Sequence, residues 1–182
     1  RALVDWPYGT PSGHIFESEN AVLIGAGIGV TPFASILESI VLRANGTSEW
    51  PSKLKKVHFF WLNRDRHSFE WFAALLSELE RIDQRRLLDV HAFMTGGHHA
   101  TSSAAVEVGR ELLHEKGESD LVTGLRAKTR MGRPDWNAEL TAIREAHAPA
   151  IVDVFFCGPR GFADEVRATC VALGMRFRDE RF

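Results

Sequence analysis

The sequence contains little cysteine, with only Cys157 and Cys170 among 182 residues. These two thiols could form one disulfide, but they fall at the end of an expected strand and inside an expected helix. Disulfides are rare in intracellular proteins, in which such thiols are buried or line a site. We therefore expect two free thiols and interpret the chain as intracellular.

An excess of either charge is also lacking. The 22 Lys and Arg residues nearly balance the 24 Asp and Glu residues, and the net charge is -2. This balance leaves no basic stripe for nucleic acid. No run approaches the roughly 18 uncharged apolar residues that span a bilayer, so we expect the piece itself to be soluble. Eight histidines include the pair His98 and His99, but a helical His-x-x-x-His pair and a Cys-x-x-Cys are both absent, so we expect no metal site.

Internal repeats and low-complexity tracts are missing as well, and a hydrophobic content of 45% suits one domain. The chain begins at Arg1 without an initiator methionine or a signal peptide, which indicates a piece of a longer protein. Residues 1–18 are dense in turn formers, and we interpret them as a linker or as the tail of a preceding lobe. Residues 19–182 are then expected to form the domain.

The most informative stretch is residues 21–32, AVLIGAGIGVTP. Residues 21–24 form a short apolar run typical of a strand buried on both faces. Three alternating glycines follow, and they allow positive φ and a close approach to a ligand: Gly25, Gly27 and Gly29. Thr31 is a candidate N-cap and Pro32 suits a first helical position, so the following helix would direct its amides at an anion. The spacing differs from G-x-G-x-x-G, and a purely structural turn is the alternative.

Apolar periodicity predicts a strand at 54–62 and a helix at 33–43 before it, then a helix at 69–81 and a strand at 87–95. It further predicts helices at 104–113, from 134 or 135 to 143, and at 162–173, with strands at 151–156 and 175–178. Residues 117–130 are ambiguous between loop and strand. The alternation of strands with helices predicts an α/β fold with a doubly wound, mostly parallel sheet. Ligands of such sheets bind beyond the carboxyl ends of the strands.

Asn63 and Arg64 follow the second strand and suggest the nature of the cofactor. An acidic side chain at this place accepts hydrogen bonds from the ribose of NAD, whereas an arginine can pair with the additional phosphate of NADP. We therefore expect a preference for NADPH. Asp65 weakens this interpretation unless it caps the next helix, and the alternative is a solvated surface arginine.

Two further candidates are Cys157, which ends a strand beside Gly158 and Pro159, and Arg133 in the loop 132–134. A small, soft side chain such as Cys157 lets a flat ring approach. We do not interpret it as a nucleophile, because no basic partner is identifiable, and a structural cysteine is the alternative. Arg133 could reach a phosphate or ribose, or simply be loop surface.

Several segments match one family in order. The turn Gly-x-Gly-x-Thr-Pro resembles the pyrophosphate turn of ferredoxin-reductase-like NAD(P)H modules. The more specific segments are GAGIGVTPFASI at 25–36, NRD at 63–65, SFEWF at 68–72, TGL at 123–125, GRPDW at 132–136, FFCG at 155–158 and the terminal Phe182. Together they resemble the NADPH-binding lobe of the NADPH oxidases, most nearly the calcium-regulated branch.

This resemblance implies hydride transfer from NADPH to FAD, followed by passage of single electrons through membrane haems to oxygen, which yields superoxide. It implies a membrane protein with this domain on the cytoplasmic side, and residues 1–18 as the tail of the flavin lobe. The implied partners are the flavin lobe, a haem-containing membrane domain and a calcium-binding regulatory domain.

The resemblance also implies roles for individual residues. Gly27, Ile28, Gly29 and Thr31 would hold the pyrophosphate, Arg64 the 2′-phosphate and Arg133 the nucleotide. Cys157 would flank the nicotinamide, and Phe182 would cover the flavin. The further cofactor-binding candidates beside them are Gly25, Pro32, Asn63, Gly158 and Pro159. Cys157 and Phe182 would thus lie at the reacting rings. A ferric or other soluble flavin reductase is the alternative enzyme, and a nucleotide-binding regulatory module is the alternative that is not an enzyme.

Overall fold

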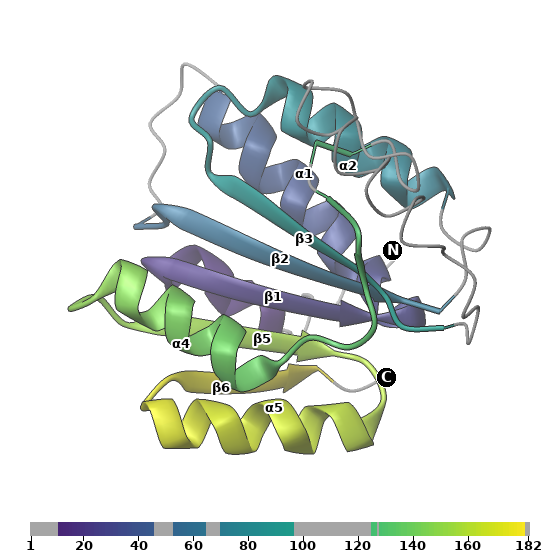
Figure 1. Ribbon diagram of the computed structural model, residues 1–182. Coiled ribbons are helices and arrows are strands. Elements are labelled where there is room, and N and C mark those ends of the chain that lie inside the picture. Colours follow the sequence, from purple (N-terminus) through teal and green to yellow (C-terminus); the bar gives the residue numbers. More distant parts are fainter. Residues whose placement is uncertain (1–10, 46–52, 65–69, 97–124, 127, 181–182) are drawn as a thin grey trace, which may run out of the picture.

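A six-stranded parallel sheet forms the centre of the computed structural model, which describes residues 11–45, 53–64, 70–96, 125, 126 and 128–180 (Figure 1). The strands are β1 (Asn20–Ala26), β2 (Lys56–Asn63), β3 (Leu88–Met94), β4 (Arg130–Met131), β5 (Val152–Cys157) and β6 (Arg176–Glu180), in the spatial order β4-β3-β2-β1-β5-β6. Every neighbouring pair is parallel. The predicted doubly wound α/β fold is therefore confirmed.

Helices cover both faces of this sheet. They are α1 (Thr31–Asn45), α2 (Glu70–Ile82), α4 (Trp136–His147) and α5 (Arg160–Leu173), with short 3-10 helices η1 (Pro11–Glu17) and η2 (Gly27–Val30). Figure 1 shows α1 and α2 on one face and α4 and α5 on the other. The predicted helix at 104–113 lies outside the described residues.

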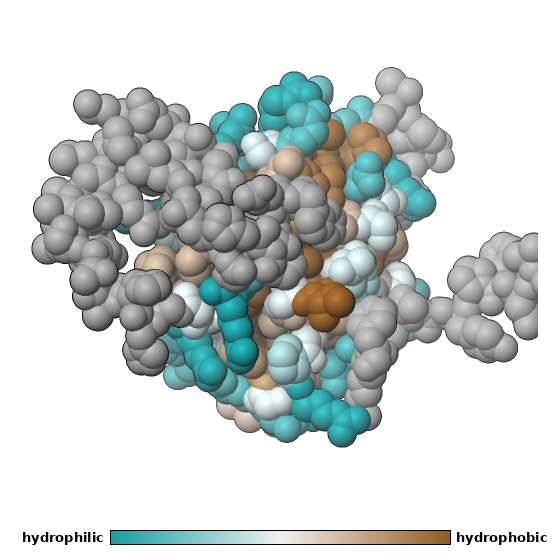
Figure 2. Space-filling model, turned by 90° about the vertical axis from the view of Figure 1, so that its right-hand side faces the viewer, coloured by the Kyte–Doolittle hydropathy of each residue, from teal (hydrophilic) through white to brown (hydrophobic). Residues whose placement is uncertain are grey.

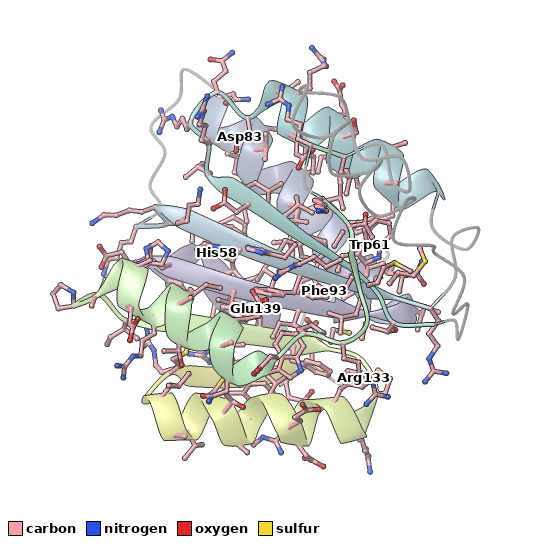
Figure 3. All side chains as sticks on the ribbon, viewed as in Figure 1. His58, Trp61, Asp83, Phe93, Arg133 and Glu139 are labelled. Carbon is pink, nitrogen blue, oxygen red and sulfur yellow. The ribbon has the colours of Figure 1, made fainter. Side chains whose placement is uncertain are left out.

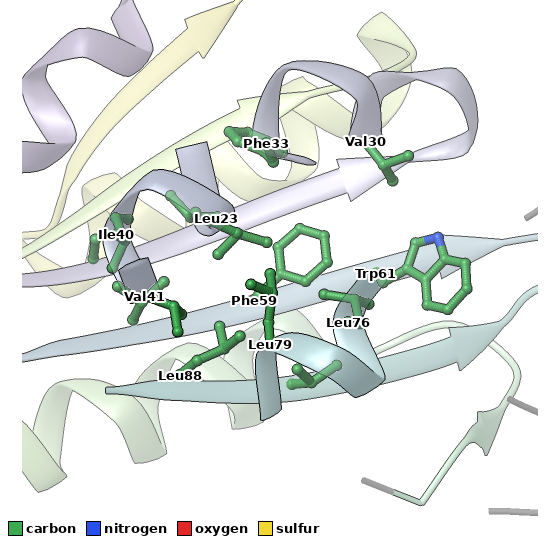
Figure 4. Packing of buried hydrophobic residues seen from close by; sticks show 14 of the residues in the cluster. Leu23, Val30, Phe33, Ile40, Val41, Phe59, Trp61, Leu76, Leu79 and Leu88 are labelled. Atoms are coloured by element: carbon green, nitrogen blue, oxygen red, sulfur yellow. The ribbon is translucent and has the colours of Figure 1, made fainter. Parts of the chain in front are cut away.

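The core consists of two clusters because successive strand residues point to opposite faces. Leu23 and Phe59 pack with α1 and α2, where Phe33 and Phe72 meet the Phe59 ring edge-on at centroid distances of 6.2 and 5.6 Å (Figure 4). Ile24 belongs to the second cluster, under α4 and α5. Since both faces are covered, β1, β2 and β5 consist almost entirely of buried residues.

Two details differ from the sequence predictions. Of the ambiguous segment 117–130, residues up to 124 lie outside the described part, and its last residue opens the two-residue strand β4. The segment Gly27–Asn45 is long and apolar enough to cross a membrane by length and composition, contrary to our expectation. Its Phe33, Leu37 and Val41 are buried against the sheet, so in this fold it is a core helix.

The 3-10 helix η1 lies within the segment that we interpreted as a linker or tail. Ile15 of η1 is fully buried and belongs to the same cluster as Phe33 and Phe59. Part of this segment therefore packs on the domain, and the boundary at residue 18 stays a prediction.

Candidate functional site

The strand order places β1 at the point where the sheet changes direction. From β1 the chain continues to β2, β3 and β4 on one side, and then returns to β5 and β6 on the other. In parallel sheets such a point lies beside a ligand-binding edge, beyond the carboxyl ends of the strands. Figure 2 views this edge, on which hydrophobic side chains reach the surface between hydrophilic ones.

The glycine turn lies at the end of β1, and each of its three positions requires glycine for a different physical reason. A Cβ at Gly25 would lie 2.9 Å from Val30 Cγ1, so this glycine lets the turn fold back on the strand. Gly27 has φ of 59°, which disfavours other residues, and a Cβ there would meet no atom within 4 Å. A Cβ at Gly29 would lie 2.2 Å from the carbonyl oxygen of Cys157, so backbone of the turn contacts backbone at the end of β5.

The predicted N-cap at Thr31 is wrong. The helical backbone already starts with η2 at Gly27, and Thr31 has helical angles, with φ of -56° and ψ of -46°. Its hydroxyl donates to the carbonyl of Ile28 at 2.9 Å instead of accepting from the helix. The N-cap of η2 is Ala26, whose side chain makes no capping bond. No side chain of the cap residue therefore satisfies the first amides of this segment, and the space beside Gly27 is open, which suits the binding of an anion.

The structure brings Arg64 to the edge next to this turn. Asn63 is the last residue of β2 and is buried, and its carbonyl accepts from Thr95 N at 2.6 Å and from Thr95 Oγ1 at 3.0 Å. Arg64 follows one residue later and is exposed. A Cβ at Gly96 would lie 2.2 Å from the Arg64 carbonyl oxygen, so the chain leaving β3 packs directly against it. Asp65, which we considered as a cap of the next helix, lies outside the described residues.

Cys157 ends β5, as predicted, and pairs in register with Gly25. Its thiol is buried, and burial, followed by the negative charges of Glu180 and Asp179, raises its pKa to about 11. The thiol is therefore protonated at neutral pH, which agrees with the expectation that it is not a nucleophile. Cys170 is buried and free as well, so the prediction of two free thiols is confirmed.

Gly158 and Pro159 continue from β5 along the same edge. A Cβ at Gly158 would lie 2.9 Å from the Cβ of Ala26, at the end of β1. Pro159 is exposed and is the N-cap residue of α5, without a side-chain capping bond. The exposed Ile28 in the glycine turn and Pro32 in the first turn of α1 complete the candidate set around this point, whereas Phe182 lies outside the described residues.

Arg133 reaches the same edge from the loop between β4 and α4. Its side chain is exposed, and its guanidinium carbon lies 4.8 Å from the ring centroid of Phe162, in the first turn of α5. Figure 3 shows Arg133 at this end of α5. The structure thus gathers the glycine turn, Arg64, the residues that follow β5, and Arg133 at one edge.

A cluster of three histidines was missed by our sequence reasoning. His58 of β2 is buried, with Nδ1 3.3 Å from His91 Nε2 on β3 and Nε2 2.8 Å from His147 Nε2 on α4. Burial first, then the positive charges nearby, lowers the pKa of His58 to about 4. A polar residue inside the apolar run of β2 was the available signal.

An all-parallel sheet whose glycine turn meets the end of a neighbouring strand is typical of α/β domains that bind a dinucleotide at the switch point. Residues 18–171 match the ferric reductase NAD binding domain family, and the chain belongs to this family.

The relatives include NADPH oxidase 5 of Homo sapiens, which is 41% identical over an alignment that covers all of this chain and 26% of that protein. A superoxide-generating NADPH oxidase heavy chain of Dictyostelium discoideum is 40% identical, over 86% of this chain and 29% of that protein. The respiratory burst oxidase homolog protein B of Solanum tuberosum is 30% identical, over 92% of this chain and 21% of that protein. The predicted resemblance to NADPH oxidases is confirmed, and the chain spans about a quarter of the length of these relatives.

Proposed function

We propose that this chain is the NADPH-binding part of a flavin- and haem-dependent transmembrane NADPH oxidase. In that protein a hydride from NADPH passes to FAD, and electrons then pass singly through haems to oxygen and make superoxide. The names of the relatives support this proposal, and so does one structural observation: backbone of the glycine turn lies directly against backbone at Cys157, while the space beside Gly27 is open.

The residues at this edge fit a dinucleotide. The uncapped helical segment starting at Gly27 offers amides to the pyrophosphate, and the absence of a side chain at Gly27 permits close approach. Arg64, the first residue past the end of the adjacent strand, is suited to pair with the 2′-phosphate. Arg133 supplies a second guanidinium from the other side of the switch point.

Cys157 and Gly158 fit the nicotinamide end of the ligand. A buried, protonated thiol neither attacks the ring nor places a charge beside it. The small Gly158 keeps the backbone after β5 close to the end of β1, because a Cβ there would lie 2.9 Å from the Cβ of Ala26. These residues orient the nucleotide, and no general acid or base is required of them, because the cofactors carry the chemistry.

We propose that FAD is held mainly by a flavin lobe, with Phe182 covering its ring, and that haem is held in a membrane domain. The lobe described here would then lie on the cytoplasmic side. A calcium-binding regulatory domain is the further partner in this proposal.

Two measurements test the proposal, one for nucleotide binding by this chain and one for the activity of the complete protein. The first is titration of the 182-residue chain with NADPH and NADH, in which we expect saturable binding with a preference for NADPH. The second uses the complete protein in membranes and follows NADPH-dependent reduction of cytochrome c with and without superoxide dismutase. Inhibition by the dismutase supports an oxidase. Reduction of a ferric chelate that the dismutase leaves unchanged would instead assign a ferric reductase, the activity named by the matched family.

A further inference from the structure

Arg133 lies in a short loop whose two ends are joined by an ion pair. The loop runs from the end of β4 to the start of α4, and Met131, Gly132, Arg133 and Asp135 are all exposed. Loop arginines of this kind lose side-chain freedom when they bind a ligand, which weakens binding unless the loop is already held. The structure contains such a restraint.

The restraint is formed by Arg130 and Glu139, nine residues apart on the two sides of the loop. Arg130 Nη1 pairs with Glu139 Oε1, and Arg130 Nη2 donates to Glu139 Oε2 at 3.2 Å. The contact is bidentate, the arrangement in which arginine and carboxylate are most strongly held. The Glu139 side chain is 20% exposed and that of Arg130 is 41% exposed, so solvent partly screens the pair and its strength depends mainly on the bidentate geometry.

Residues of β3 also hold the Arg130 side chain in place. Its guanidinium carbon lies 4.1 Å from the ring centroid of Phe93 on β3, and its Nη2 lies 3.5 Å from His91 Nδ1. Figure 3 shows Glu139 and Phe93 on the face of the sheet that α4 covers. The pair is therefore attached to the sheet, and it holds both ends of the loop against it.

Further contacts also hold the loop in place. The amide of Gly132 donates to the carbonyl of Met94 at 2.9 Å, and the carboxylate of Asp135 caps α4 by accepting from Ala138 N at 3.1 Å. At the tip, one face of the Arg133 guanidinium lies over Phe162. Within the described residues no carboxylate pairs with Arg133, so its N–H groups are available to a ligand.

We infer that Arg130 and Glu139 are positioning residues that preorganise Arg133 for the nucleotide. The inference rests on the proposed function, because it requires Arg133 to contact the bound nucleotide. It assigns no direct contact to Arg130 or Glu139: their effect passes through Arg133.

A double-mutant cycle on the full 182-residue chain tests this inference, with NADP+ as the probe and calorimetry as the measurement. Glu139→Gln keeps the shape of the side chain and removes the charge, and we expect it to weaken NADP+ binding about three- to tenfold, where tenfold corresponds to about 1.4 kcal/mol. In an Arg133→Ala background the same substitution should have little effect, since its path to the ligand is gone. Arg130→Met should behave in the same way as Glu139→Gln.

Glu78→Gln is the matched control. Glu78 makes a bidentate pair with Arg81 on α2, which lies on the face of the sheet opposite α4, so its loss should leave the affinity unchanged. Circular dichroism and urea unfolding check that each variant is folded. A loss of affinity at Glu139→Gln that is equal in both backgrounds would overturn the inference, because a general structural defect gives that result.

The remaining outcomes separate the inference from the proposed function. If Arg133→Ala weakens binding and Glu139→Gln does not, the positioning role is refuted and the nucleotide site stands. If the wild type binds NADP+ and Arg133→Ala binds it equally well, both the contact assigned to Arg133 and the positioning role are refuted. If the wild type binds no NADP+ at all, the proposed function fails together with the inference.

Discussion

Acidification should destabilise this domain through His58, and the size of the effect follows from the cluster on β2, β3 and α4. Arg130 approaches His91 Nδ1 as a donor, so the His91 proton is assigned to Nε2, facing His58 Nδ1. Neutral His58 then carries its proton on Nε2, facing His147. Protonation of His58 would put a second proton on Nδ1, against the Nε2–H of His91.

The pKa of His58 is lowered from 6.5 to about 4, by burial first and then by His91, with His147 and Lys56 adding to it and Asp89 opposing it. Because the unfolded chain binds this proton at a higher pH than the folded chain does, stability is complete above pH 6.5 and is lost as the pH falls toward 4. Each pKa unit is worth about 1.4 kcal/mol, so the loss between about pH 7 and pH 4.5 is on the order of 2 kcal/mol.

Urea unfolding at a series of pH values measures this loss. His58→Gln cannot titrate, so its free energy of unfolding should fall less than that of the wild type over the same range. Val171→Ala, at an exposed position on α5 that does not titrate, is the control and should follow the wild type. If His58→Gln loses as much stability as the wild type between about pH 7 and pH 4.5, the buried neutral His58 is not the cause and the reasoning fails.

Four further predictions concern single substitutions. Gly29→Ala should lower the free energy of unfolding by about 1–3 kcal/mol in urea unfolding, because its Cβ would collide with the Cys157 carbonyl. Gly27→Val should stay folded but lose NADPH binding in calorimetry, and normal NADPH binding by the folded variant would show that the phosphate site lies elsewhere. Arg64→Ala should narrow the preference for NADPH over NADH in nucleotide titrations, and an unchanged affinity ratio would remove Arg64 from the site. In the intact flavin-containing enzyme, Phe182→Ser should tighten nicotinamide binding and change the rate of flavin reduction in stopped flow; if neither changes, Phe182 is only the end of the chain.

Much of the fold could be predicted because its determinants are local. β1, β2 and β5 are short apolar runs, and the intervening helices carry apolar residues at helical spacing, so their types and order follow from periodicity. β4 could not be predicted in this way, since two residues have no period. It exists because Arg130 and Met131 find hydrogen-bonding partners on β3, which is a tertiary contact.

In the candidate site, too, local features could be predicted from the sequence and tertiary contacts could not. The glycines are recognisable in sequence, but the reason for Gly29 is its contact with Cys157, which lies far away in the chain. Thr31 was assigned the wrong role because the helical turn starts earlier, at Gly27, and local capping rules do not anticipate a 3-10 turn. The pairing of Arg130 with Glu139 depends on the direction in which α4 leaves its cap at Asp135.

Binding of the nucleotide at the glycine turn can be tested by an NMR titration of the ¹⁵N-labelled 182-residue chain with NADPH. We expect the largest amide shifts in residues 27–31 and 158–162, with smaller changes at Arg64 and Arg133, since these groups share one edge of the sheet. Shifts concentrated at the opposite edge, around Lys56 and His147, or no shifts at saturating NADPH, would contradict the claim that this domain binds the nucleotide at its glycine turn.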